Sequence, residues 1–110
     1  MTAEQLYDKL IIIQEKTGLI FNREKSKTLE LLEGLLVNRE RYGYMSCPCR
    51  LASGELENDQ DIICPCVYCQ PDIAEYGSCY CHLYVSKEWN EGAIPQVYVP
   101  ERRSADKTVF

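Results

Sequence analysis

The cysteines are the residues in this chain whose type and spacing point to chemistry. All seven lie between positions 47 and 81, and six of them form three Cys-x-Cys units: Cys47-Pro48-Cys49, Cys64-Pro65-Cys66 and Cys79-Tyr80-Cys81. Two thiolates one residue apart can both face a small inorganic cluster from a tight turn, and proline stiffens such a turn because it fixes φ. Iron–sulfur clusters are usually held by four thiolates. Three cysteines then remain, and two of them can form a redox-active dithiol and disulfide pair.

A structural zinc site is the main alternative interpretation of these cysteines. Zinc also accepts four cysteines, and a metal would help to stabilise so short a chain. Zinc ligands usually have two to four residues between them, and among consecutive cysteines only Cys66 and Cys69 show that spacing, so the pattern favours a cluster. A secreted disulfide scaffold fits less well, because the cysteine count is odd and the first residues show no apolar region of the kind found in signal peptides, since Asp8 and Lys9 interrupt the stretch. We therefore expect a cytoplasmic protein whose cysteines are ligands and catalytic thiols.

Length and charge narrow the class of protein. The chain has 110 residues, which predicts one domain spanning 1–110. Its formal net charge of −5 at pH 7 argues against non-specific binding to nucleic acid, which needs a basic face. No apolar run approaches the ~20 residues of a membrane span. We expect neither a nucleic acid nor a membrane as partner.

Residues 1–43 carry no cysteine and are predicted to form a helical scaffold of two helices. Thr2 and Gln5 fit a capping box at the start of the first helix, and Gly18 suits its end. One face of this helix is predicted to carry Leu6, Leu10 and Ile13. Asn22 is predicted to cap the second helix, which has leucine stripes and stops at Gly43.

Residues 44–86 form the expected cysteine-rich active region, and residues 87–110 form a tail. Pro71 and Gly77 predict one short helix between them. Strand-forming residues occur at 83–85 and 97–99, and the charged stretch from Glu101 is predicted to be loose. The expected fold is a small metal-organised domain that is mostly α-helical with little β-structure.

The run Cys47-Pro48-Cys49-Arg50, followed by Cys64-Pro65-Cys66 and then by Cys79-x-Cys81, resembles the catalytic subunit of ferredoxin–thioredoxin reductase in a bacterial or archaeal form. The resemblance covers essentially residues 5–86, including the two preceding helices. It implies that the helices and loops wrap around one [4Fe–4S] cluster that lies beside a redox-active disulfide. Carried over to this sequence, it implies the cluster ligands Cys47, Cys64, Cys66 and Cys79. The redox pair is then Cys49 and Cys81.

The resemblance implies an oxidoreductase, a ferredoxin-dependent disulfide reductase. A ferredoxin gives single electrons through the cluster, and the resulting dithiol reduces thioredoxin or a similar protein by exchange. Cys49 would attack the substrate disulfide, and Cys81 would resolve the mixed disulfide. An acidic ferredoxin would need a local basic patch, for which the candidates are Arg50, Lys87, Arg102 and Arg103. The alternatives are a zinc-binding interaction module and an iron–sulfur electron carrier without a working disulfide.

The third cysteine unit departs from the resembled family. Plant-type members have a histidine between its two cysteines, where this chain has Tyr80. His82 follows Cys81 and would point to the same side as Tyr80 if the segment were extended. His82 is therefore a candidate catalytic acid or base, with a structural role as the alternative.

Cys69 and Arg50 also call for an interpretation. The resemblance gives Cys69 no role, so it is either a buried thiol that packs like a small apolar side chain or an extra redox thiol or ligand. Arg50 is expected either to lower the pKa of the adjacent Cys49 or to point into solvent.

Overall fold

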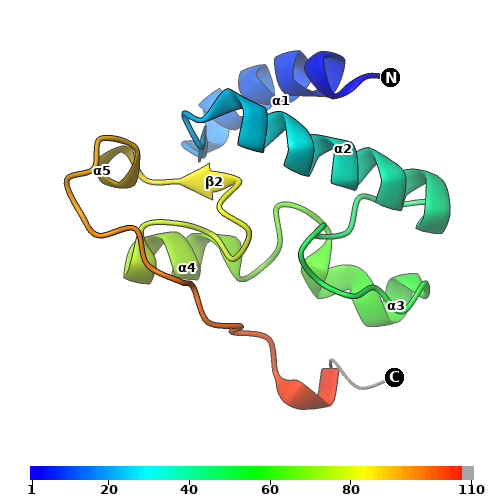
Figure 1. The fold of residues 1–110 in the computed structure, drawn as a ribbon. Helices are drawn as coiled ribbons and strands as arrows, with labels where there is room; N and C mark the ends of the chain where they lie inside the picture. The colour runs from blue at the N-terminus through cyan, green and yellow to red at the C-terminus, as the bar shows by residue number, and fades with distance from the viewer. Residues whose placement is uncertain (108–110) are drawn as a thin grey trace.

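Two long helices lie side by side above a layer of shorter elements that carries the cysteines (Figure 1). The structure, a computed structural model, describes residues 1–107. The long helices are α1 (Ala3–Thr17) and α2 (Lys25–Tyr42), and the second layer holds α3 (Leu56–Asp59), the 3₁₀ turn η1 (Gln60–Ile62) and α4 (Cys69–Tyr76). The remaining elements are β1 (Ile20–Phe21), β2 (Tyr84–Val85), α5 (Lys87–Asn90) and the 3₁₀ turn η2 (Ala105–Lys107). The predicted small, mostly helical fold with little β-structure is confirmed.

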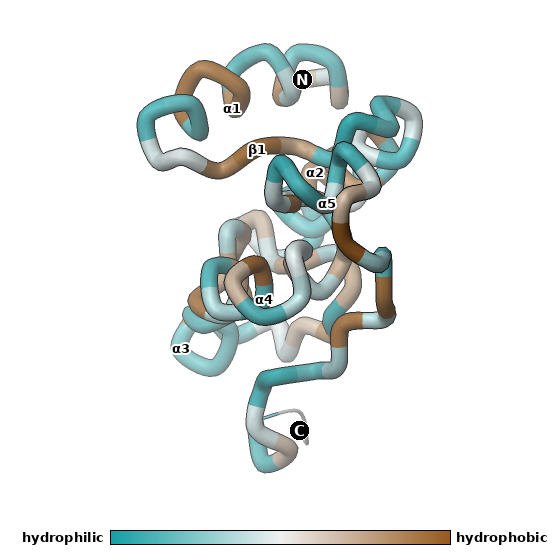
Figure 2. The backbone as a smooth tube through the Cα atoms, turned by 90° about the vertical axis from the view of Figure 1, so that its left-hand side faces the viewer, coloured by the Kyte–Doolittle hydropathy of each residue, from teal (hydrophilic) through white to brown (hydrophobic). Residues whose placement is uncertain are grey.

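Helix α1 begins at the predicted capping box. The Thr2 hydroxyl accepts a hydrogen bond from the backbone N–H of Gln5, whose side chain accepts one from the backbone N–H of Thr2. Leu6 is buried as expected, but Ile13 is 53 % exposed and does not belong to the buried face. Figure 2 shows this part of α1 as an apolar stretch on the outside of the molecule.

Helix α2 starts at Lys25, slightly later than the sequence predicts. Asn22 does not cap it directly: its side-chain oxygen accepts from the backbone N–H of Glu24, which is the residue before the helix. The helix ends at Gly43, as predicted, with φ at 89°. Its buried face carries Thr28, Leu31, Leu32 and Leu35.

A two-residue antiparallel ladder joins the two layers. Ile20 in β1 pairs with Val85 in β2, and Phe21 pairs with Tyr84. The Phe21 ring also stacks on Tyr84, with centroids 5.2 Å apart. The sequence predicts β2 but not β1, whose two residues are too few to show a period.

Residues 97–99 belong to no strand, so the predicted second strand is wrong. Val99 is buried, while Val97 is 44 % and Tyr98 is 77 % exposed. These β-branched and aromatic residue types, which strands favour, predict a strand, but the segment has no pairing partner within the described residues. Figure 1 shows this segment running from α5 down the outside of the molecule towards η2. The apolar residues along this path appear as brown stretches after α5 in Figure 2.

The remaining predictions concern α4 and the charged tail. Helix α4 forms as predicted and ends before Gly77, but it starts two residues before Pro71, at Cys69. The stretch from Glu101 is not loose over its described part, because Glu101, Arg102 and Arg103 all form ion pairs. Residues 108–110 of the predicted tail lie outside the described residues. Within residues 1–107, no helix is both long and apolar enough to cross a membrane.

Candidate functional site

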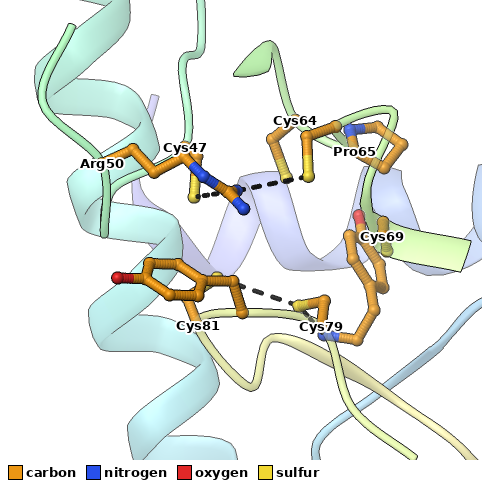
Figure 3. A pocket seen from close by; sticks show the side chains of 10 residues that line it. Cys47, Arg50, Cys64, Pro65, Cys69, Cys79 and Cys81 are labelled. Atoms are coloured by element: carbon orange, nitrogen blue, oxygen red, sulfur yellow. Dashed lines mark hydrogen bonds between the residues drawn. The ribbon is translucent and has the colours of Figure 1, made fainter. Parts of the chain in front are cut away.

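Six of the seven cysteines line one small cavity beneath α2. Its wall consists of Cys47, Cys64, Cys66, Cys69, Cys79 and Cys81 together with Arg50, Pro65, Tyr80 and Tyr84. Figure 3 shows the labelled cysteines facing a common space, with the guanidinium of Arg50 reaching between them. The structure therefore brings together the four predicted ligands and Cys81, although they are up to 34 positions apart in the sequence.

The donor set of this cavity fits an iron–sulfur cluster, because thiolates are the ligands that such clusters take. The space between the sulfurs is about 10 Å³, which holds about one water molecule. In the described part of the chain, no group of three or more His, Cys, Asp and Glu side chains is arranged to hold a single metal ion.

Backbone turns aim the thiols into the cavity. The N–H of Arg50 donates to the carbonyl of Cys47, and the N–H of His82 donates to the carbonyl of Cys79, so the first and third units each close a tight turn. The first unit is also joined to the second, since the N–H of Cys64 donates to the carbonyl of Met45. The predicted tight turns are thus present around the first and third Cys-x-Cys units.

Cys49 and Cys81 have contrasting surroundings. All seven cysteines are free thiols in this structure, with Cys49 exposed and Cys81 buried. A hydrogen bond from the Cys81 thiol lowers the pKa of Cys49, which favours its thiolate. Hydrogen bonds to Cys47, Cys49 and Cys79 and burial raise the pKa of Cys81, which keeps its proton. An exposed, more acidic thiol thus lies beside a buried, less acidic one.

Cys69 is the cysteine outside the three Cys-x-Cys units, and it is the first residue of α4. It is 2 % exposed and lines the same cavity as the predicted ligands. Its hydrogen bond to Cys79 raises the pKa of Cys69 and lowers the pKa of Cys79. Cys69 is therefore buried, as the packing interpretation requires, and it also lines the cavity, as a role as ligand or redox thiol requires. It supplies a hydrogen-bond donor to the predicted ligand Cys79.

Arg50 does not point into solvent, and its sulfur contacts are to Cys47 and Cys66. Its side chain is 3 % exposed, and its Nη1 donates to the sulfurs of Cys47 at 3.5 Å and Cys66 at 3.4 Å. Its Nε and Nη2 donate to the two carboxylate oxygens of Glu101, each at 2.7 Å. These contacts raise the pKa of Arg50 against the effect of its burial, so the cation is retained.

Tyr80 and His82 point in different directions, because the segment is a turn and not extended. His82 has a φ of 63°, in the left-handed region. The Tyr80 ring centroid lies 4.5 Å from the guanidinium of Arg50. The His82 ring stacks on Trp89 at 5.5 Å, and its Nδ1 lies 2.6 Å from the hydroxyl of Ser78. Burial lowers the pKa of His82, which favours the neutral ring near pH 7.

The candidate basic patch is not made of free cations. Arg50 and Arg103 are buried in ion pairs with Glu101 and Asp61, and Arg102 pairs with Asp72 and Glu75. Lys87 is exposed and lies 3.8 Å from Glu91. The arginines predicted for partner binding therefore hold the fold together.

Sequence reasoning missed Glu101 and Tyr68, which both contact Arg50. The Tyr68 ring centroid lies 5.2 Å from the guanidinium. Glu101 is 51 positions away from Arg50, and nothing in the local sequence pairs them. Only the density of charge at 101–103 marks this segment as unusual.

Comparisons with known proteins agree with the motif. The family described as "Ferredoxin thioredoxin reductase catalytic beta chain" matches residues 2–102. The "Ferredoxin-thioredoxin reductase, catalytic chain" of Guillardia theta is 32 % identical over 76 residues, which cover 67 % of this chain and 71 % of the relative. The protein of the same name from Porphyra purpurea is 29 % identical over 98 residues, which cover 87 % of this chain and 74 % of the relative.

Proposed function

Because this chain belongs to the ferredoxin thioredoxin reductase catalytic beta chain family, we propose that it takes single electrons from a ferredoxin and reduces the disulfide of thioredoxin or a similar protein. The observation that carries the proposal is the shared cavity, which gathers the thiols of all three Cys-x-Cys units. The family match confirms the resemblance seen in the motif. Disulfide reduction is the activity that the names of the relatives support.

The proposed cofactor is a [4Fe–4S] cluster held by Cys47, Cys64, Cys66 and Cys79. All four line the cavity, and the buried cation of Arg50 offsets part of their negative charge. When bound, the cluster would supply electrons one at a time, whereas opening a disulfide consumes two. The chain's own task is to keep Cys81 at the cavity and to expose Cys49 to the substrate.

The two remaining thiols carry the proposed exchange. Two electrons and two protons convert a Cys49–Cys81 disulfide into two thiols. The Cys49 thiolate attacks one sulfur of the substrate disulfide, that bond breaks, and the other substrate sulfur leaves and takes a proton. Cys81 then loses its proton and attacks Cys49, which re-forms the Cys49–Cys81 disulfide and releases the second substrate sulfur as a thiol. The exposure and lowered pKa of Cys49 support its role as the attacking thiol.

His82 is proposed to act as the acid or base near Cys81. If the Ser78 hydroxyl donates to the carbonyl of Cys79, Ser78 accepts from Nδ1–H of His82, and Nε2 of His82 then carries no proton. A neutral ring with one free nitrogen can accept a proton near pH 7. The left-handed turn at His82 and the stack of its ring on Trp89 hold the ring in one orientation.

The first experiment is anaerobic purification followed by analysis of iron, sulfide and zinc, with a count of free thiols. We expect about four iron and four sulfide per chain, together with two cysteines protected as a disulfide. Zinc without sulfide would contradict the proposal and indicate that the protein is a zinc-binding structural or interaction module. A cluster with Cys49 and Cys81 permanently reduced would indicate an electron carrier instead.

Paired serine variants test the assignment of the thiols. Cys49→Ser should retain iron and sulfide but lose disulfide reduction, because it removes the attacking thiol and no ligand. Cys47→Ser, two residues away in the same turn, should lose most of the iron. Loss of iron from Cys49→Ser would show that the ligand assignment is wrong.

A further inference from the structure

We propose that Arg50 is a positioning residue that sets the reduction potential of the metal–sulfur group, with Glu101 as its counterweight. This inference rests on the proposed function, since it concerns the cluster that the cavity thiols would hold. It assigns a role to two residues that are neither ligands nor part of the dithiol exchange.

The geometry divides the guanidinium into two sides. Nε and Nη2 face the Glu101 carboxylate as a two-point fork at 2.7 Å, and Nη1 faces the sulfurs of Cys47 and Cys66. The carboxylate fixes the plane of the fork, because both of its oxygens are engaged. Arg50 is thereby held with one N–H group against two predicted ligands.

Two tyrosine rings and burial keep water away from this cation. Tyr68 and Tyr80 place their ring centroids 5.2 Å and 4.5 Å from the guanidinium. The Arg50 side chain is 3 % exposed, whereas that of Glu101 is 27 % exposed. Water screens a charge less the more deeply it is buried, so the sulfurs experience Arg50 more strongly than Glu101. Tyr80 occupies the position between the cysteines of the third unit and serves here as a cover for Arg50.

The sign of the effect follows from charge. Uptake of one electron, given up by a ferredoxin, adds one negative charge beside these sulfurs. A nearby cation stabilises that reduced form, and N–H donation to the sulfurs acts in the same direction, so both raise the reduction potential. Glu101 opposes the cation through its own charge while holding it in place.

The test is a comparison of midpoint potentials, measured by spectroelectrochemical titration of the anaerobically purified protein. Arg50→Gln should shift the potential down, and Glu101→Gln should shift it up by a smaller amount. Both variants break the same ion pair, so a purely structural role would shift both potentials in one direction or leave both unchanged. The opposite signs are therefore specific to charge.

Arg102→Gln is the matched control. Like Arg50, Arg102 forms ion pairs with carboxylates, but its partners are Asp72 and Glu75, and it donates to none of the cavity sulfurs. It should leave the potential unchanged. Hydrogen exchange of residues 99–103 should rise in all three variants, which shows that loosening the tail does not itself shift the potential.

The outcomes separate this inference from the proposed function. If the wild-type protein holds no iron and sulfide, the proposed function fails and this inference fails with it. If the cluster is present but the two potentials move together or not at all, only the inference is overturned. If Arg50→Gln cannot retain the cluster, Arg50→Lys, which keeps the charge without the fork, should restore it, and the upward shift in Glu101→Gln decides the question.

Discussion

Cys49 differs from Cys81 in its exposure to solvent, and this difference decides which thiol can react with a protein substrate. A substrate disulfide is too large to enter the cavity where Cys81 lies, whereas Cys49 is exposed and is not among the residues that line this cavity. Iodoacetamide added to the reduced protein should therefore modify Cys49 first, with a rate that reaches its plateau at a lower pH than for free cysteine. Peptide mapping by mass spectrometry measures both the site and the rate.

The control for this prediction removes the hydrogen bond that makes Cys49 acidic. In Cys81→Ala the rate profile of Cys49 should move to higher pH, because the donor that lowers the pKa of Cys49 is gone. First modification at Cys81 in the wild-type protein would contradict the division of roles between the two thiols.

Cys69 and Cys79 form a second instructive pair at this scale. Cys69 supplies a hydrogen bond to Cys79, but only Cys79 belongs to a Cys-x-Cys unit. We expect Cys69→Ala to retain iron and sulfide, with a loss of stability of about 1 kcal/mol for a buried hydrogen bond. Cys79→Ala should lose the metal. Metal analysis of the two variants checks this, and loss of iron from Cys69→Ala alone would make Cys69 the fourth ligand.

At Gly34, helix α2 packs directly against the first cysteine turn of the site. A Cβ built at Gly34 in α2 would lie 2.8 Å from Cβ of Pro48, the residue between Cys47 and Cys49. That proline atom is part of a rigid ring, so it cannot turn away. Helix α2 thus needs glycine in its middle to let the first cysteine turn pack against it.

Gly34→Ala tests this contact because two effects oppose each other. Alanine should stabilise the helix by about 1 kcal/mol, while the clash with Pro48 should cost about 1–3 kcal/mol. We expect a net loss of stability in chemical denaturation, and Ser26→Ala on the exposed side of α2 is the control without a clash. Pro48→Gly should relieve the clash in a double variant. A clear gain of stability in Gly34→Ala would refute the close packing.

Local signals in the sequence predict the helices, but they do not predict the contacts between segments that lie far apart in the sequence. The capping box and terminal glycines of α1 and α2 act over a few residues, so they can be predicted. The error at Asn22 arose because its side chain bonds Glu24 just outside the helix. The ladder between Ile20 and Val85 joins segments 65 positions apart, and no local pattern encodes it. The same limit hid Glu101, whose partner Arg50 lies far away in the sequence.

Residues 101–103 tie together parts of the cysteine layer that lie far apart in the sequence, and we call this segment the strap. Glu101 reaches the first cysteine turn at Arg50, Arg102 reaches α4 at Asp72, and Arg103 reaches η1 at Asp61. Three consecutive residues thereby tie three separate parts of the cysteine layer together. A chain this small has a thin core, so such ties carry a large share of its order.

Acid should release this strap. Hydrogen bonds from Arg103 and Tyr68 outweigh burial and lower the pKa of Asp61, and the Arg50 fork likewise outweighs burial and lowers the pKa of Glu101. A carboxylate with a lowered pKa in the folded state contributes stability above its unfolded pKa of about 4, and this contribution is lost as pH falls through the folded value. Hydrogen exchange at residues 99–103 should therefore be slow at pH 6 and relatively faster, after correction for intrinsic rates, below about pH 4.

Two variants and one contrary outcome test this prediction. Arg103→Met, which leaves Asp61 without its arginine partner, should lower the free energy of unfolding by about 3 kcal/mol and show fast exchange already at pH 6. Lys87→Met, which removes an exposed pair, should behave like the wild-type protein. Protection that stays constant from pH 6 to pH 3 would show that these ion pairs do not hold the strap, and the order of the segment would then have to come from the burial of Val99 alone.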